Sequence, residues 1–241
     1  METKDSGVQL LQVAHSPYCQ TVRIALAEKG VPFTVIEEDL LNKSKLLLES
    51  NPMHRKVPVL IHNGRPIAES TIIVQYLDDT WPVAFGGPDR HSFLPDTAYR
   101  RAQARFWVDF LHAKVFKTTD QMLKAKDDEI DRAAFNESML SLNSAIIQCA
   151  GDERPFFFGK RLGYVDLVLA PFISWFSSLD KFVNLRIPPR TEAPRLHEWI
   201  ESLSEHPTIK AVLFDNAFVE QKMAGVRAVY RRIAEGRKAQ G

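Results

Sequence analysis

Short apolar runs alternate with a helical pattern over the N-terminal third of the chain. Residues 8–13 form an apolar run that predicts a buried strand. Ser16 and Pro17 then give a helix start, an N-cap hydroxyl followed by proline at the first helical position, and Gly30 gives the stop. Residues 31–36 are rich in β-branched and aromatic side chains, which favours a second strand. The segment therefore predicts a β-α-β unit with parallel strands.

The next segment predicts a hairpin followed by a helix. Residues 57–61 have the composition of a third strand. Asn63 and Gly64 are a strong two-residue hairpin signal, so residues 66–68 are expected to form the partner strand. Ser70 is expected to cap the helix that follows. Together these elements predict an α/β domain with a mixed four-stranded sheet.

The hydrophobic period changes in the second half. Residues 82–95 contain two adjacent glycines and several prolines, which is typical of an interdomain linker. Asp96 is expected to cap the first long helix after it, and no strand-like alternation interrupts the helical patterns beyond. These patterns cover residues 96–111, 128–150, 166–179, 196–203 and 212–233. We therefore expect an α/β domain at residues 1–82, a linker at 83–95 and an all-α helical bundle domain at 96–241.

Composition and charge narrow the function classes. The formal net charge of +1 gives no support to nucleic-acid binding. Cys19 and Cys149, the two cysteines, do not make a disulfide framework and fit a reducing compartment. No segment has the pattern of a signal peptide or of a membrane span, so we expect a cytoplasmic protein without a membrane partner. Metal-ligand spacings and nucleotide-binding glycine motifs are also missing, so neither a metal nor a cofactor is expected.

Ser16 is the first candidate for chemistry. It follows the first strand and opens a helix, where free backbone amides and the helix dipole favour an anion. Its hydroxyl could donate to a thiolate and lower the pKa of that thiol. Alternatively, the hydroxyl merely caps its own helix. Cys19, three residues later, is expected to be a buried, inert thiol.

Two further features could bind a peptide-like ligand. If the Val57–Pro58 bond is cis, the Val57 N–H and C=O are free to pair with an extended ligand; if it is trans, Pro58 merely starts a strand. Glu69 could meet an ammonium group, and Ser70 with the following amides could meet a carboxylate. The alternative for Glu69 and Ser70 is a plain helix cap beside a surface carboxylate.

The order of these motifs resembles that of the cytosolic glutathione transferases, and most closely the plant tau class. The resemblance implies a thioredoxin-like fold for the N-terminal domain, glutathione as co-substrate and a homodimer. It extends over nearly the whole chain. It is carried by the segments 16–18, 22–26, 29–31, 37–44, 46–48, 51–52, 57–64, 69–70, 74–78, 104–109 and 163–167.

The resemblance also implies residue roles. Ser16 matches the serine that hydrogen-bonds the glutathione sulfur. The electrophile pocket is expected at four positions, with Arg23 close to the first of them: Tyr18, Phe116, Leu123 and Trp175. The other glutathione contacts are expected at Lys43 and Lys56 for the glycine carboxylate, at the Val57 backbone for the cysteinyl part, and at Glu69 and Ser70 for the γ-glutamyl group.

The resemblance and the residues together predict an enzyme of detoxification. We expect a glutathione S-transferase that conjugates the glutathione thiolate to small hydrophobic electrophiles, with glutathione peroxidase activity as a second expectation. Two alternatives remain at the level of the sequence. One is a non-catalytic carrier of apolar ligands. The other is a thiol–disulfide reductase that works through an exposed, low-pKa Cys19.

Overall fold

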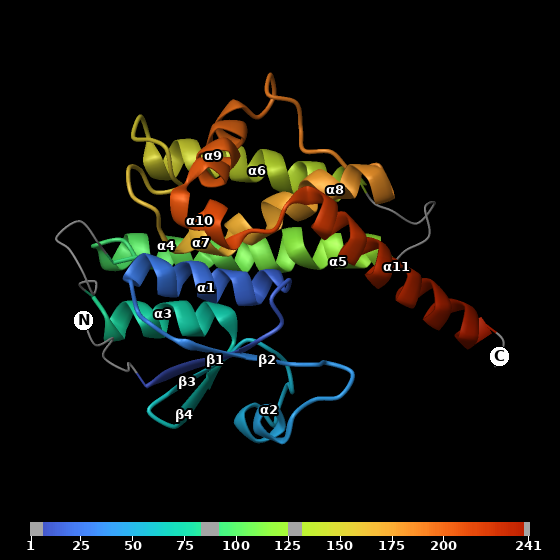
Figure 1. Ribbon diagram of the computed structural model, residues 1–241. Coiled ribbons are helices and arrows are strands. Elements are labelled where there is room, and N and C mark those ends of the chain that lie inside the picture. Colours follow the sequence, from blue (N-terminus) through green and yellow to red (C-terminus); the bar gives the residue numbers. More distant parts are fainter. Residues whose placement is uncertain (1–6, 83–91, 125–131, 239–241) are drawn as a thin grey trace.

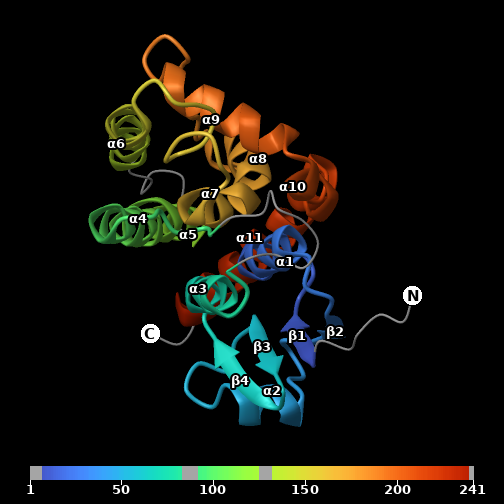
Figure 2. The ribbon, with the colours of Figure 1, turned by 90° about the vertical axis from the view of Figure 1, so that its left-hand side faces the viewer.

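The N-terminal part of the protein is a four-stranded sheet with helices on both faces, and the remainder is helical. The structure, a computed structural model, describes residues 7–82, 92–124 and 132–238. In Figure 1 the sheet lies below α1 and α3, and the helical part lies above these two helices. Figure 2 shows the same order from the side: the sheet, then α1 and α3, then the helical domain. The two-part architecture is therefore as predicted.

The sheet confirms the predicted mixture of parallel and antiparallel pairs. Its strands are β1 (Val8–Gln12), β2 (Thr34–Glu37), β3 (Val59–His62) and β4 (Arg65–Ala68), in the order β2-β1-β3-β4. β1 pairs in parallel with β2 and antiparallel with β3, and β3 and β4 form the hairpin. The parallel pair requires a crossover, which α1 (Pro17–Lys29) supplies.

Neighbouring residues of β1 pack into two separate apolar clusters on opposite faces of the sheet. Leu10 is fully buried beneath α1 and α3 (Ser70–Thr80), in a cluster that continues into the helical domain. Leu11 points to the other face of the sheet, where it packs with Leu47 of α2 (Lys45–Ser50). The alternation follows from the two-residue side-chain period of a strand. It places α1 and α3 between the sheet and the helical domain.

Over its described residues, the helical domain consists of α-helices and of two irregular helical segments. The π-helical segment η1 and the 3-10 turn η3 continue the helices on either side of them. The elements are α4 (Ala98–Phe110), η1 (Leu111–Phe116), α5 (Lys117–Lys124), α6 (Arg132–Ala150), α7 (Tyr164–Leu169), η3 (Ala170–Phe172), α8 (Ile173–Val183), α9 (Pro194–Glu205), α10 (Pro207–Val212) and α11 (Asn216–Lys238). None of the described helices combines the length and the apolar composition needed to cross a bilayer.

Two predicted helix caps are wrong by one residue. Ser70 is the first helical residue of α3, and Glu69 holds the cap position, because the Glu69 carbonyl already accepts the Ile73 amide at 2.8 Å. Thr97, and not Asp96, caps α4, since its side chain accepts a hydrogen bond from the Arg100 amide at 3.2 Å. The Gly30 stop is confirmed: it ends α1 in the left-handed conformation with φ of 64°.

Two predicted helices are also divided. The pattern over residues 166–179 covers α7, η3 and α8, and Pro171 at the break has no amide to continue the helical hydrogen bonds. The pattern over residues 212–233 begins in α10, and the chain then turns before Asp215 caps α11 by accepting the Phe218 amide at 2.8 Å. Apolar periodicity cannot show such breaks, because both helices at a break present apolar side chains to the same core.

Buried polar groups fix the helices of this domain. The Asp166 carboxylate accepts from the Gly163 amide (2.7 Å), the Phe157 amide (3.0 Å) and the Trp199 indole (2.5 Å), so it caps α7 and ties it to α9. Burial raises the pKa of Asp166 to about 6, although these donors act in the opposite direction. Gly163 holds the N-cap position of α7, and Asp166 completes a capping box with it.

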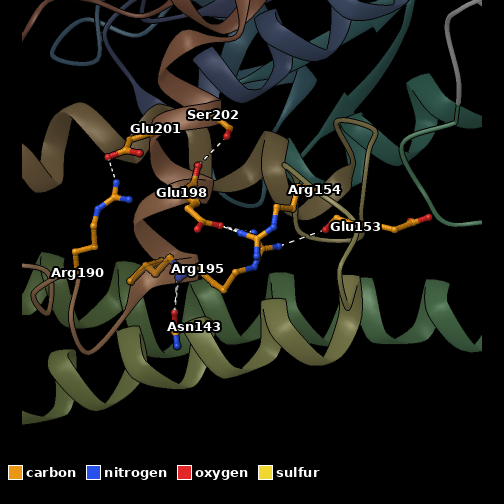
Figure 3. Close-up of polar contacts among 9 residues, drawn as sticks. Asn143, Glu153, Arg154, Arg190, Arg195, Glu198, Glu201 and Ser202 are labelled. Atoms are coloured by element: carbon orange, nitrogen blue, oxygen red, sulfur yellow. Dashed lines mark hydrogen bonds and ion pairs between the residues drawn. The ribbon is translucent and has the colours of Figure 1, made fainter.

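A second polar cluster holds the start of α9 against α6. The Asn143 side chain accepts the backbone amides of Arg195 and Leu196 at 3.0 and 3.1 Å. Figure 3 shows the Arg195 guanidinium beside Glu198, which also pairs with Arg154. The amides at a helix start need such acceptors when the helix end is buried.

A buried ion pair between α1 and α3 also holds the chain that leads to the helical domain. Lys29 at the end of α1 lies 2.7 Å from the Asp78 carboxylate of α3, and both side chains are almost fully buried. The same carboxylate accepts the amides of Phe93 (2.8 Å) and Leu94 (3.1 Å) and the Ser92 hydroxyl (2.6 Å). The chain that enters the helical domain is therefore bound at this point. Residues 83–91 of the predicted linker lie outside the described residues, and the domain boundaries stay a prediction.

This geometry predicts that substitution of Asp78 destabilises the protein more than substitution of Lys29. Asp78→Ala leaves the Lys29 ammonium without its buried carboxylate and removes an acceptor from three linker groups. We expect the free energy of unfolding to fall by about 3–5 kcal/mol. Lys29→Met leaves Asp78 with its three other donors, so the loss should be smaller. Urea unfolding followed by circular dichroism measures both.

Lys181→Met is the matched control, because it breaks the exposed Lys181–Glu220 pair of 2.7 Å and should cost no more than about 1 kcal/mol. Equal losses for Asp78→Ala and Lys29→Met would contradict the role given to the linker hydrogen bonds.

Candidate active site

Ser16 stands at the N-cap position of α1, but its hydroxyl does not cap the helix. Its backbone is extended, with φ of −69° and ψ of 123°, and its side chain makes no hydrogen bond to the first-turn amides. The hydroxyl interacts instead with the Cys19 thiol. Ser16 is half-buried. The hydroxyl and the first amides of α1 are therefore not engaged with each other, and both can serve an anion at the helix start.

Cys19 is buried beneath this helix start, as predicted. Its side chain is fully buried, and burial raises the pKa of its thiol to about 11, against the opposing effects of the Val13 backbone and the Ser16 hydroxyl. Nucleophilic thiols need the opposite environment, exposed and with a lowered pKa. The structure therefore lacks the thiol that a reductase working through Cys19 requires.

The loop between β1 and α1 is held by Glu37 at the end of β2. The Glu37 carboxylate accepts the Ala14 amide at 2.7 Å and the Gln12 side-chain amide at 3.1 Å. On the other side, the His15 ring meets the Phe218 ring of α11 edge-on at 6.3 Å. Burial and the nearby Lys222 lower the pKa of His15. The segment that precedes Ser16 is thus fixed between the sheet and the last helix.

A cleft of about 230 Å³ lies next to this helix start. It brings together five predicted site residues: Tyr18, Lys56, Val57, Glu69 and Ser70. Pro58, of the Val57–Pro58 feature, lines it as well, and sequence reasoning missed three other lining residues, which are Asn51, Thr71 and His112. Ser16 and Lys43 do not line the cleft itself: Ser16 lies two residues before Tyr18, and Lys43 lies in the loop before α2. A larger, more open hollow of about 630 Å³ between α4 and α6 contains none of the predicted site residues.

The Val57 backbone is available to a ligand. The Val57–Pro58 peptide bond is cis, which answers the question that the sequence left open. No hydrogen bond in the described part of the chain uses the Val57 N–H or C=O. The loop before it is fixed by the buried Asn51 side chain, which donates to the Lys56 carbonyl at 3.0 Å and accepts the His54 amide at 3.2 Å. Asn51 thus positions Lys56 and Val57 at the cleft.

Glu69 has an unusual backbone conformation. Its φ of 71° and ψ of 115° are sterically unfavourable for a side chain with a Cβ atom. Such conformations cost about 1–3 kcal/mol and gather at functional sites. Here the conformation turns the chain from β4 into α3 and leaves the Glu69 carboxylate about half exposed, beside the buried Ser70 at the helix start. A carboxylate next to free helix amides suits a ligand that carries both an ammonium and a carboxylate.

Contacts from the helical domain fix this end of α3. The Tyr164 hydroxyl donates to the Thr71 carbonyl at 3.2 Å, and the Gln75 amide donates to the Tyr164 oxygen at 3.1 Å. The Arg105 guanidinium of α4 in turn donates to the Gln75 carbonyl oxygen at 2.8 Å. The position of the α3 start therefore depends on both domains.

Tyr18 and His112, which line the cleft, belong to an aromatic cluster that continues into the helical domain through the buried Phe116 and Phe172. The Tyr18 ring stacks on the His112 ring at 6.1 Å with an angle of 14°, and it meets the Phe172 ring edge-on at 5.6 Å. Phe116 stacks on Phe172 at 3.6 Å and lies edge-on to His112 at 5.2 Å. We call these four residues the aromatic wall. It joins Tyr18 and Phe116, two of the predicted electrophile residues, and adds two that the sequence did not suggest.

The other two predicted electrophile residues are not joined to the aromatic wall. Leu123 is buried in α5, and Trp175 of α8 packs half-buried against the main core. Among the described residues, no ring contact links Trp175 to the wall. Their place in the electrophile pocket stays a prediction. Within the same residues, no cluster of three or more metal-ligating side chains exists.

Comparisons with known proteins agree on one family. The family model for the glutathione S-transferase N-terminal domain matches residues 15–80, and that for the C-terminal domain matches residues 127–202. The chain is 39% identical to glutathione S-transferase 3 of soybean (Glycine max), over 86% of this chain and 90% of that protein. It is also 39% identical to glutathione S-transferase U28 of Arabidopsis thaliana, over 95% and 99%.

Solved structures give the same result. A tau-class glutathione S-transferase from mango superposes with a TM-score of 0.82 at 34% identity, covering 92% of this chain and 99% of the mango chain. A rice enzyme, solved in complex with glutathione, superposes with a TM-score of 0.82 at 38% identity, covering 95% and 99%.

The burial of Cys19 generates a prediction about thiol reactivity. With a pKa of about 11, roughly one Cys19 thiol in a thousand is ionised at pH 8, and the folded protein shields it from reagents. An aromatic disulfide reagent should therefore modify the half-buried Cys149 first and reach Cys19 only on unfolding. Mass spectrometry of the peptides distinguishes the two, and a Cys149→Ser variant isolates Cys19. Rapid modification of Cys19 in the folded protein, blocked by glutathione, would contradict the expectation.

Proposed function

Because the chain belongs to the tau class of the glutathione S-transferases, we propose that it conjugates glutathione to hydrophobic electrophiles, with Ser16 as the residue that activates the thiol. The observation that carries the role of Ser16 is that its hydroxyl does not hydrogen-bond to the amides of its own helix and, among the described residues, contacts only the inert Cys19 thiol. Ser16 occupies the N-cap position, yet its side chain makes no hydrogen bond to the first amides of α1. A hydroxyl at the N-cap position that does not bond to the helix amides can instead hydrogen-bond to a ligand.

In this proposal glutathione lies across the cleft as an added strand. The Val57 N–H and C=O pair with the cysteinyl backbone, since no other partner uses them within the described residues. Glu69 meets the γ-glutamyl ammonium, and Ser70 with the amides of α3 meets the γ-glutamyl carboxylate. Lys56, exposed at the opposite end, meets the glycine carboxylate, and Lys43 adds positive charge there. This placement points the cysteine sulfur of glutathione at the start of α1.

The chemistry at Ser16 is the stabilisation of a thiolate. The glutathione thiol releases its proton to solvent, and the Ser16 hydroxyl donates a hydrogen bond to the sulfur anion at the positive end of α1. A tenfold rise in the thiolate population requires about 1.4 kcal/mol, and one hydrogen bond to a charged group contributes about 1.5–3 kcal/mol. The sulfur then bonds to an electrophilic carbon, and the electron pair leaves with the displaced group.

The electrophile is proposed to bind against the aromatic wall. Tyr18 offers an exposed aromatic ring at the cleft, and the buried Phe116 and Phe172 support it from behind, which suits a hydrophobic and often planar substrate. Leu123 and Trp175 complete this pocket in the proposal. The carrier and reductase alternatives are not favoured, because the similar proteins are named as glutathione S-transferases and Cys19 is buried.

Assembly and location are part of the proposal. Large apolar side chains are exposed on neighbouring helices: Tyr99 and Phe106 of α4 are 73% and 58% exposed, and Ile72 of α3 is 53% exposed. Tyr99 and Phe106 are seven residues apart and thus share one face of α4. Apolar surface of this kind supports burial against a second copy, so we propose a cytoplasmic homodimer.

The proposal predicts a change in the pH dependence of catalysis. Ser16→Ala removes the hydrogen bond to the thiolate, so the kinetic pKa of bound glutathione should rise by about one unit or more. Turnover near neutral pH should fall about tenfold or more, while glutathione affinity changes little. The pH–rate profile with an aryl halide measures the pKa, and isothermal titration calorimetry measures the affinity.

Thr97→Ala is the matched control, because the Thr97 side chain does hydrogen-bond to its own helix and Thr97 does not line the cleft. It should cost about 1 kcal/mol of stability and leave the kinetic pKa unchanged. Ser16→Thr keeps a hydroxyl and should restore part of the activity. An unchanged pH–rate profile in Ser16→Ala would refute the role of Ser16.

A further inference from the structure

We propose that His112, on the π-helical segment η1 of the helical domain, is a glutathione-binding residue whose Nε2 donates a hydrogen bond to the γ-glutamyl carboxylate. The proposal rests on the proposed function, because it takes glutathione as the ligand of the cleft. It goes beyond that function by giving the helical domain a direct contact with the co-substrate. All the glutathione contacts proposed so far come from the N-terminal domain.

The first observation is an unpartnered ring nitrogen on a residue that lines the cleft. His112 lines the cleft opposite the start of α3, together with Glu69, Ser70 and Thr71. Its Nε2 atom is buried and has no hydrogen-bond partner among the described residues. Buried polar atoms in native proteins are nearly always paired, and one that is not deserves a ligand or a water as its explanation. In a cleft that suits a charged tripeptide, the ligand is the simpler explanation.

The second observation is that the imidazole ring is held in place. It stacks on Tyr18 and lies edge-on to Phe116 at 5.2 Å, so two other residues of the aromatic wall contact it. A ring packed in this way cannot turn its nitrogen toward another partner without losing these contacts. The π-helical turn that carries His112 is a rare conformation, often found at functional sites. The nitrogen is therefore positioned before a ligand arrives.

The charges around the ring decide which ligand group it meets. Burial lowers the pKa of His112, and this effect outweighs Asp109 and Glu69, which act in the opposite direction. The ring is therefore neutral near pH 7, and a neutral imidazole carries one N–H donor. Glu69 is already assigned to the ligand ammonium. The carboxylate next to it has several acceptor positions, more than the Ser70 hydroxyl and the α3 amides fill.

The test compares binding with folding stability. Isothermal titration calorimetry with glutathione should show a dissociation constant raised about tenfold or more in His112→Leu, because a hydrogen bond to a charged group is lost. His112→Gln keeps an N–H donor and should recover most of the affinity. In the absence of ligand, the thermal midpoint of His112→Leu should be unchanged or higher, since an unpaired buried polar atom has been removed. A merely structural role would instead lower the midpoint.

A ligand analogue identifies the contacted group. A tripeptide with 4-aminobutyrate in place of the γ-glutamyl residue lacks only the α-carboxylate. The wild-type protein and His112→Leu should bind this analogue equally, if weakly, whereas an analogue with glutarate, which lacks only the ammonium, should still distinguish them. A tenfold difference that persists with the 4-aminobutyryl analogue would overturn the assignment to the carboxylate.

His206→Leu is the matched control, since His206 also has a buried ring nitrogen without a hydrogen bond in the described part of the chain but does not line the cleft, and this nitrogen lies 3.8 Å from the Glu28 carboxylate. Glutathione should bind this variant as it binds the wild type. Equal affinity of His112→Leu and the wild type for glutathione would overturn the proposal while leaving the proposed function intact. A wild-type protein that binds no glutathione would instead refute the proposed function itself.

Discussion

The buried contact between Lys29 and Asp78 determines how the two helices of the active site are arranged. α1 and α3 lie side by side, and the ion pair joins them near their C-terminal ends. Their N-terminal ends carry Ser16 and Ser70, one for the sulfur and one for the γ-glutamyl end of the proposed ligand. Because a helix is rigid over three turns, a contact at one end limits the movement of the other. The distance between the two ligand contacts thus depends on a pair of charges that never meets the ligand.

The same carboxylate explains why the helical domain is not loosely attached. Asp78 binds the chain just before that domain begins, and the Phe93 carbonyl accepts the Tyr164 amide at the start of α7 at 2.9 Å. Tyr164 then reaches back to the start of α3 through its hydroxyl. The contacts form a closed path from α3 through the linker and α7 to α3 again. In such a path each contact fixes the geometry that the next one needs.

Local signals in the sequence predicted the parts of this arrangement that depend on neighbouring residues. Ser16, Pro17 and Gly30 mark the limits of α1, and Asn63 with Gly64 marks the hairpin, because caps and turns are decided within a few residues. The predicted glutathione-binding residues Lys56, Val57, Glu69 and Ser70 do share one cleft, which their order along the chain indicated through the family resemblance.

What the sequence could not predict depends on tertiary packing. The cap of α3 was misplaced because a glutamate is not expected at a φ of 71°, and only the surrounding fold holds it there. His112 and Phe172 carry no local sign of a cleft: each is one more residue on an apolar helix face. The role of Asn51 is hidden for a similar reason, since its two hydrogen bonds form only once the loop is closed.

The apolar core has a consequence for the independence of the two domains. One cluster of buried side chains runs without interruption from Leu10 in the sheet, through Leu26 and Ile73, to Trp199 and Met223 in the helical domain. The N-terminal domain on its own would expose the faces of α1 and α3 that this cluster covers. If two members of the family exchanged a whole domain, the position of the junction in the chain would matter less than the fit of the side chains between the two domains. A glutathione-binding half and a substrate-binding half can evolve at different rates only where their shared side chains remain compatible.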